Sequence, residues 1–231
     1  MQSRRLAGLL VVVCLASTSR LLAQVPRWVV TNRWRGYGSQ QTEMFWVNGD
    51  AWRVRYRPAG TGIFQIAVYD ASGSLVDVAT NQNRAEPVFG SATLRGRGQR
   101  YLGITGVGTT WEVSVEQHVS TAEEWHLRQL LAQPRPQLLK LGLWTGSGGT
   151  SEYTFTVPSR SWQVRQTHSG DGLLQILIED AQGFVALGAN DVHAAEGTSW
   201  VHRAGTFTMR VQSDDVDWKV EVLCEDAARG D

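Results

Sequence analysis

One offset of 110 residues lays the first half of this 231-residue chain over the second. Between residues 34 and 78, 15 of 45 positions are identical to residues 144–188, with no gap. The shared residues are mainly glycines, tryptophans and aliphatic residues, for example Trp52 and Trp162. A small unit made twice is the economical interpretation. Because these residue types mostly build folds, the repeat constrains architecture more than it constrains function.

Apolar and polar residues alternate in both halves. In the second half the alternation is clearest in three runs: Tyr153-Phe155-Val157, Leu174-Ile176-Ile178 and Trp218-Val220-Val222. A period of two predicts strands with one buried face. Asp70 and Gly73, like Asp180 and Gly183, hold the first and fourth positions of a tetrapeptide, as a type I turn prefers. We therefore expect short strands joined by tight turns.

Seven or eight antiparallel strands per half, with no helix among them, can bury their apolar faces only against a second sheet. The predicted fold class is all-β: two tandem antiparallel β-sandwich domains, jelly-roll or immunoglobulin-like, joined by a short helical linker. A small barrel is the alternative. The sandwich is favoured because about 90 residues in strands of about six residues suit two packed sheets.

One stretch between the halves has a helical pattern. Thr121 and Glu124 have the spacing of a capping box, a narrow leucine stripe follows, and Pro134 ends the helix. We expect this order of segments: a signal peptide at residues 1–23, a first β-sandwich domain at 24–118, a linker with the helix at 119–136, a second β-sandwich domain at 137–226 and a tail at 227–231.

The N-terminus has the features of a secretory signal. Arg4 and Arg5 precede an uncharged run at residues 6–16, as in the charged and apolar regions of a signal peptide. The run is shorter than the roughly 20 apolar residues that span a membrane. We expect cleavage after Ala23, with Ala16 as the alternative, and a secreted or periplasmic protein without a transmembrane segment.

Cysteine offers no internal cross-link. Cys14 lies in the expected signal, and lipidation there is the less favoured alternative because the large Val13 precedes it. Only Cys224 remains after cleavage, so each domain must be stabilised by its apolar core. Three matched tryptophans per half supply much of that core: Trp34, Trp52 and Trp111 in the first, and Trp144, Trp162 and Trp218 in the second.

The charge balance excludes a nucleic-acid partner. Residues 24–231 carry 19 basic and 22 acidic residues, a net charge of −3, whereas nucleic-acid binding usually requires a basic excess. Four arginines make the first half locally basic: Arg84, Arg95, Arg97 and Arg100. They are compatible with an acidic polysaccharide or a phosphate surface, although solvated loops are the favoured interpretation.

The chain has no enzyme signature. His168 and Asp171 are close in sequence, but no nucleophile is placed beside them, so a tight hairpin loop is favoured over a catalytic pair. We therefore expect a protein that is not an enzyme and has neither a cofactor nor a metal. One calcium site is considered, at Asp214, Asp215 and Asp217. A solvated loop is favoured there, because Ca²⁺ needs six or more oxygens and only three carboxylates are present.

Aromatic residues that differ between the halves are the candidate binding residues. They are Trp46 opposite Thr156, Tyr37 opposite Ser147, and Trp200 opposite Gly90. Exposed Trp and Tyr side chains can stack on sugars or anchor a protein partner. The competing interpretation is that they cover a domain interface or a sheet edge.

Three motifs in the second half carry a family resemblance. They are Asp180-x-x-Gly183 after an apolar strand, Ala204-Gly-Thr-Phe-Thr-Met-Arg-Val211, and Trp218-x-Val-x-Val222. Together they resemble the pre-peptidase C-terminal type of β-sandwich domain over residues 140–224, and more faintly over 30–117, where Gly98-Gln-Arg-Tyr101 replaces the Gly-Thr-Phe step. Such domains are appended to bacterial secreted proteins, often peptidases. The resemblance implies no catalytic residues and an accessory role in substrate or surface binding.

We therefore expect an exported, non-catalytic protein whose tandem β-sandwich modules bind a protein or a component of the cell envelope. The alternative is a carbohydrate-binding module that uses the exposed aromatics Trp46, Tyr37 and Trp200. A hydrolase with an unfamiliar site is the least favoured of the three hypotheses.

Overall fold

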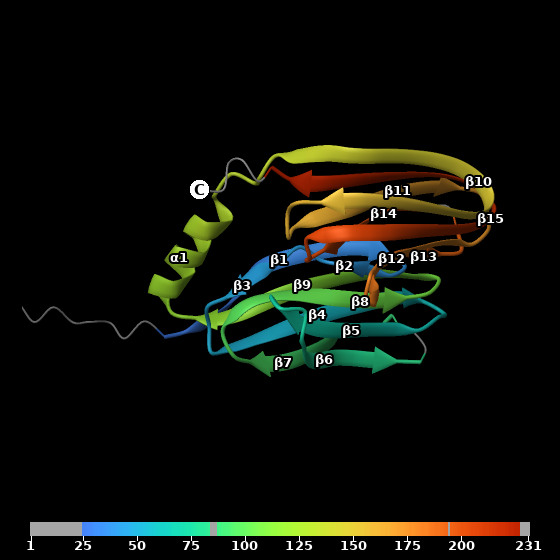
Figure 1. The fold of residues 1–231 in the computed structure, drawn as a ribbon. Coiled ribbons are helices and arrows are strands. Elements are labelled where there is room, and N and C mark those ends of the chain that lie inside the picture. Colours follow the sequence, from blue (N-terminus) through green and yellow to red (C-terminus); the bar gives the residue numbers. More distant parts are fainter. Residues whose placement is uncertain (1–24, 84–86, 194, 227–231) are drawn as a thin grey trace, which may run out of the picture.

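The computed structural model describes residues 25–83, 87–193 and 195–226. The expected signal peptide with Cys14, the residue Arg84 and the tail at 227–231 lie outside this described part. The described chain is all-β with a single helix, which confirms the predicted fold class. Two β-sandwiches lie one above the other, and the helix lies at one end of the pair (Figure 1).

Sandwich 1 is built from the strands that precede the helix. They are β1 (Arg27–Tyr37), β2 (Gln40–Gln41), β3 (Phe45–Val47), β4 (Ala51–Gly60), β5 (Phe64–Asp70), β6 (Leu75–Gln82), β7 (Gly90–Arg95), β8 (Gly98–Gly106) and β9 (Thr109–Val119). One sheet has the order β1-β9-β4-β7. The other has the order β2-β8-β5-β6, with β3 also paired to β8. Two antiparallel sheets with these crossovers form a jelly roll.

Sandwich 2 repeats that order with fewer, longer strands. They are β10 (Leu138–Val157), β11 (Trp162–Ser169), β12 (Leu174–Asp180), β13 (Gly183–Asp191), β14 (Ala195–Val201) and β15 (Gly205–Glu225). β10 and β15 pair along their whole length and take part in both layers. The later part of β15 pairs with β11, and its earlier part pairs with β12. Sandwich 1 achieves the same connection with separate strands, joined by turns.

The strand register shows that the offset between the copies changes. Trp52 pairs with Gln117, while its counterpart Trp162 pairs with Cys224. The offset is therefore 107 residues in the later strands instead of 110. Gln163 pairs with Trp200 as Arg53 pairs with Thr93, so the structural counterpart of Trp200 is Thr93 and not Gly90.

Each sandwich has its own apolar core. Trp52 and Trp162 are fully buried, each within the apolar core of its sandwich. A second indole closes one end of each core, and it lies directly against a glycine of the neighbouring strand. A side chain at Gly36 would overlap Trp111, and a side chain at Gly146 would overlap Trp218. The glycines kept in both halves therefore make room for the tryptophans kept in both halves.

The helix α1 (Thr121–Leu131) begins one residue earlier than the sequence indicated. Its N-cap is Ser120, and the reciprocal capping-box partner is Glu123 rather than Glu124. Glu124 instead accepts hydrogen bonds from Arg27 at 2.7 Å and from Arg128 at 2.7 Å, and so ties the helix to β1.

Replacement of Trp162 by Ala should lower the free energy of unfolding of sandwich 2 by roughly 3–5 kcal/mol, because it removes a fully buried indole and leaves a cavity. It also leaves the Arg203 carbonyl without the 2.8 Å hydrogen bond from Trp162 Nε1. Urea denaturation measures the change. Trp46→Ala is the matched control, since Trp46 is 48% exposed. Equal losses in the two variants would contradict this account of the core.

Candidate functional site

The two sandwiches meet along the short strand β2. Ser199 Oγ, from β14, accepts a hydrogen bond from the Gln41 amide at 3.0 Å and donates one to the Leu187 carbonyl at 2.9 Å. The edge of β2 is thus covered by a side chain of the other sandwich. Covering an edge strand in this way satisfies its backbone and prevents further pairing.

His202 makes a second connection between the sandwiches. Its Nε2 lies 2.9 Å from the Thr42 carbonyl oxygen, so the ring carries its proton there and donates it. The imidazole also packs on Tyr101, with 4.3 Å between ring centroids. Burial lowers the pKa of His202 to about 4 and raises that of Tyr101 to about 12. Both side chains are therefore neutral around pH 7, which suits a buried interface.

A groove of about 530 Å³ lies between the sandwiches beside this interface. We call it the inter-module groove. Its principal lining residues are Trp34, Gln40 and Trp111 from sandwich 1, and Arg165, Glu196 and Trp200 from sandwich 2. Gly197 permits the close approach of the two walls, because a side chain there would meet Gln166 Nε2 at 2.8 Å and Gln40 Nε2 at 3.0 Å.

Arg165 is a free cation in this groove. Its counterpart in sandwich 1, Arg55, donates to Glu116 at 3.1 Å. The position of Glu116 is taken by Leu223 in sandwich 2, as the register shows. Within the described residues Arg165 has no ion-pair partner and is exposed. Arg165 therefore lacks the carboxylate partner that Arg55 has, and it faces the groove.

A buried polar cluster lies behind the groove. Gln166 Nε2 donates to Asp191 Oδ2 at 2.8 Å, and Gln166 Oε1 lies 3.4 Å from His168 Nδ1. Asp191 Oδ1 has no hydrogen-bond partner among the described residues, and the backbone of Gly38 from sandwich 1 closes over it. Burial raises the pKa of Asp191 to about 7, opposed by the hydrogen bond from Gln166. Burial also lowers the pKa of His168.

The three aromatic residues singled out from sequence do not form one site. Trp200 lines the inter-module groove. Tyr37 lies next to this groove with its hydroxyl buried, and its pKa is raised by burial and by the nearby Asp191 carboxyl. Trp46 lies elsewhere, in a hollow between sandwich 1 and helix α1 that Leu127 and Leu130 also line.

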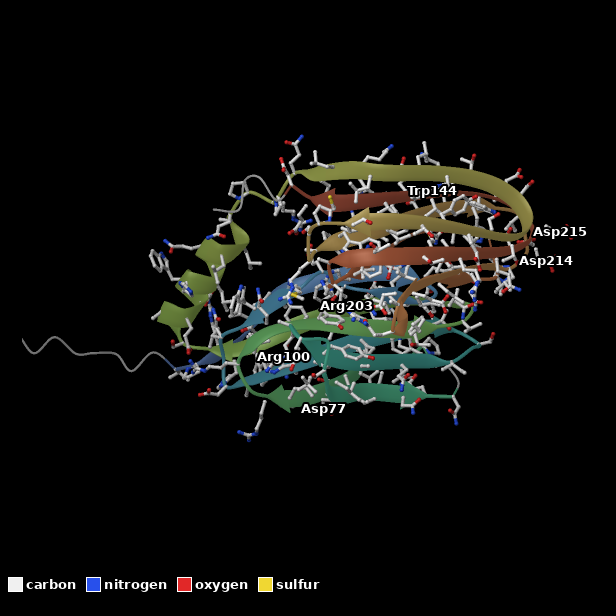
Figure 2. All side chains as sticks on the ribbon, in the orientation of Figure 1. Asp77, Arg100, Trp144, Arg203, Asp214 and Asp215 are labelled. Atoms are coloured by element: carbon white, nitrogen blue, oxygen red, sulfur yellow. The ribbon has the colours of Figure 1, made fainter. Side chains whose placement is uncertain are left out.

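The polar motifs considered from sequence are separated by the fold. His168 points into the buried cluster, whereas Asp171 is exposed and lies 3.5 Å from His193. Asp214 and Asp215 lie at the far tip of sandwich 2, where β15 bends (Figure 2). Asp215 adopts φ 53° at this bend. Within the described residues no group of three or more His, Cys, Asp or Glu side chains is arranged to hold a metal ion.

Three groove residues were not recognised as candidates from sequence. Trp34 and Trp111 each have a matched tryptophan in the second half, Trp144 and Trp218, so sequence reasoning places both in the core alone. Each does pack on the core of sandwich 1, yet each also reaches the groove. Gln166 gave no signal, because its counterpart is Tyr56 and its role depends on Asp191, 25 residues away.

Comparisons with known proteins identify no family for this chain. No protein-family model matches it, and no curated protein does. A conserved protein of unknown function from Pseudomonas aeruginosa is 11% identical over 86% of this chain and 82% of its own, with a TM-score of 0.27. A turret protein of Sulfolobus turreted icosahedral virus is 9% identical over 85% and 97%, with a TM-score of 0.29. A fucolectin from striped bass serum is 9% identical over 84% and 85%, with a TM-score of 0.24. At these scores none bears on function.

In the part of the chain that the structure describes, no helix has the length and apolar character needed to cross a bilayer.

Replacement of Asp191 by Asn should change how stability depends on pH. The folded pKa of about 7 lies above the unfolded value of about 3.9. The parent protein therefore loses stability as pH rises from about 4 to about 7, because over this range the unfolded state releases the proton of this carboxyl while the folded state still holds it.

The amide that Asp191→Asn introduces cannot ionise. This variant should therefore match the parent near pH 4 and exceed its free energy of unfolding by roughly 2–4 kcal/mol at pH 8. Urea denaturation across this pH range measures the difference. A constant difference at every pH would show that Asp191 does not titrate as described.

Proposed function

We propose that this protein is a non-catalytic binding protein whose two β-sandwich modules together hold a carbohydrate in the inter-module groove. The observation that carries the proposal is the composition of that groove. Half-buried indoles, Trp34 and Trp200, stand beside planar hydrogen-bonding groups, Gln40 and Arg165. A pyranose ring has an apolar C–H face and a rim of hydroxyls, which match an indole face and amide or guanidinium donors respectively.

The connection between the modules supports this proposal. The Gln41–Ser199 and Thr42–His202 hydrogen bonds fix the two walls of the groove relative to one another. A preformed site loses less conformational entropy when it binds a ligand than one that must assemble. Arg165 is also exposed and has no ion-pair partner among the described residues, so its guanidinium can donate to a ligand in the groove.

Trp200→Ala should weaken glycan binding about tenfold or more, because it removes one stacking surface of the groove. A glycan array identifies a bound sugar, and calorimetry with that sugar measures the affinities. Trp46→Ala is the matched control, because Trp46 is exposed outside the groove. Full binding by Trp200→Ala, or loss of binding by Trp46→Ala, would contradict this placement of the site.

A second candidate function is attachment to a protein of the cell envelope, and one observation favours it. Leu139, Leu141 and Leu143 are 43%, 41% and 50% exposed on β10, which pairs only with β15 among the described strands. Exposed apolar residues along an edge strand are typical of a protein contact. Both candidates fit a protein that acts outside the cytoplasm, as the expected signal peptide predicts.

Pull-down from an envelope fraction tests this second function. A Leu139→Ser, Leu143→Ser variant should recover less of a specific partner than the parent protein, since both substitutions remove apolar contact area. Equal recovery by the variant and the parent would exclude this edge as the contact.

A further inference from the structure

The outer surface of the β1-β9-β4-β7 sheet carries an unusual concentration of arginines. Side chains alternate along a strand, so burial of Trp52 and Val54 in the core turns the intervening residues of β4 outward. Two further arginines extend outward from β1. We call the set the arginine face: Arg33, Arg35, Arg53, Arg55 and Arg57.

The strand register fixes how these cations are spaced. Arg33 and Arg55 flank Ser114 of β9, and Arg35 and Arg57 flank Glu112. Outward residues repeat about every 7 Å along a strand, and strands on either side of a central one are about 10 Å apart. The backbone positions of neighbouring arginines are therefore separated by about 7 to 10 Å across the sheet and do not converge on one point.

Carboxylates of the same sheet neutralise only part of this charge. Arg53 donates to Glu116 at 2.6 Å and Arg55 at 3.1 Å. Burial works against ionisation of Glu116, but the hydrogen bonds from both arginines outweigh it and hold the pKa of that carboxyl below its usual range. Arg35 lies 3.2 Å from Glu112. The five arginines therefore face two glutamates.

Two arginines remain without a carboxylate. Among the described residues, neither Arg33 nor Arg57 forms an ion pair, and the Arg57 guanidinium lies 4.9 Å from the centre of the Phe89 ring. Both line a groove of about 580 Å³ on the arginine face, together with Trp34 and the 64%-exposed Phe89. The groove thus combines two guanidinium groups that have no ion-pair partner among the described residues with one exposed aromatic ring, Phe89, and it is also lined by the paired Glu112 and Glu116.

Of the four arginines noted in the sequence, the three that the structure describes do not make this face. Arg97 is paired with Asp50 at 2.7 Å, and Arg100 donates to the Gln99 and Arg97 carbonyls at 2.8 Å each. Arg95 is outward on β7 but does not line the groove.

We propose that the arginine face binds an acidic polysaccharide, whose carboxylate or sulfate groups are held by Arg33 and Arg57. A guanidinium fork matches the geometry of these planar or tetrahedral anions. The exposed Phe89 ring can accept the apolar face of a sugar ring, which a bare phosphate backbone does not offer. The whole chain has 22 basic and 22 acidic residues and so has no basic excess. This balance also argues against nucleic acid, whose binding usually requires such an excess.

This inference rests on the proposed function, because it names the ligand class of the same glycan-binding protein. Trp34 and Arg35 line both the inter-module groove and the groove on the arginine face. One polysaccharide chain that crosses β1 would therefore contact both grooves.

Calorimetry on the full-length protein tests the proposal. The probes are an oligogalacturonate, the same oligomer with its carboxyl groups methyl-esterified, and anionic phosphatidylglycerol vesicles. We expect binding of the acidic oligomer that weakens with added salt, and much weaker binding of the ester. Arg33→Gln with Arg57→Gln should reduce the affinity for the acidic oligomer about tenfold or more.

The matched control is Arg95→Gln with Arg160→Gln, which changes the net charge equally at exposed arginines that have no ion-pair partner among the described residues and lie outside both grooves. It should bind like the parent protein. Equal affinity for the acid and the ester, an unchanged affinity in the Arg33/Arg57 variant, or binding to the vesicles alone would overturn the proposal. Thermal melts verify that each variant is folded.

Trp200→Ala separates this proposal from the proposed function. Loss of binding in Trp200→Ala alone, with the Arg33/Arg57 variant unchanged, overturns the acidic-polysaccharide inference and leaves the inter-module groove as the site. Loss in the Arg33/Arg57 variant alone supports the inference and counts against that groove.

Discussion

Burial of indole rings between paired sheets stabilises both halves of this structure and positions the elements around them. The described chain holds one cysteine, Cys224, which is buried and unpaired, so no disulfide limits the unfolded state. Trp52 and Trp162 remove large apolar surfaces from water in the core of each sandwich, and the burial of such surface is the main favourable term in folding. The glycines Gly36 and Gly146 let the end-closing indoles lie flat on a neighbouring strand. Tryptophan and glycine therefore had to be kept together in both copies.

The two copies solve one geometric problem in different ways. Each jelly roll must carry its chain from one sheet to the other. Sandwich 1 does so with a turn between β8 and β9, whereas sandwich 2 bends the continuous strands β10 and β15. The bend uses positive φ angles at Gly148, Gly149 and Asp215. Asp215 is the one described residue other than glycine with such an angle, which Asp tolerates better than most residues. The bend in β15 thus accounts for an aspartate at position 215, at the far tip of sandwich 2.

The two copies differ in the charged residues that line the grooves. In sandwich 1, Arg53 and Arg55 share Glu116, and Arg33, Arg35 and Arg57 lie on the same face. In sandwich 2 a leucine takes the position of that glutamate, and Arg165 has no ion-pair partner among the described residues. The same framework therefore presents five arginines on this face of sandwich 1, whereas in sandwich 2 Lys140 and Lys219 share Glu221 and Arg165 stays without such a partner in the described part of the chain.

Residue patterning alone was enough to predict the fold class, since strict alternation, turn residues and matched tryptophans leave few ways to bury one face of so many short strands. It also identified Trp200 as a residue that the core does not need. The counterpart predicted for Trp200 was wrong, because the offset between the copies changes from 110 to 107 residues and no identical residue marks where the deletion lies. The packing of one sandwich on the edge of the other was needed to bring Trp200 to Trp34 and to set Asp191 against Gly38. Those contacts join residues more than 150 positions apart in the chain. Local periodicity describes which face of a strand is buried, but it carries no information on which surfaces of two finished modules meet.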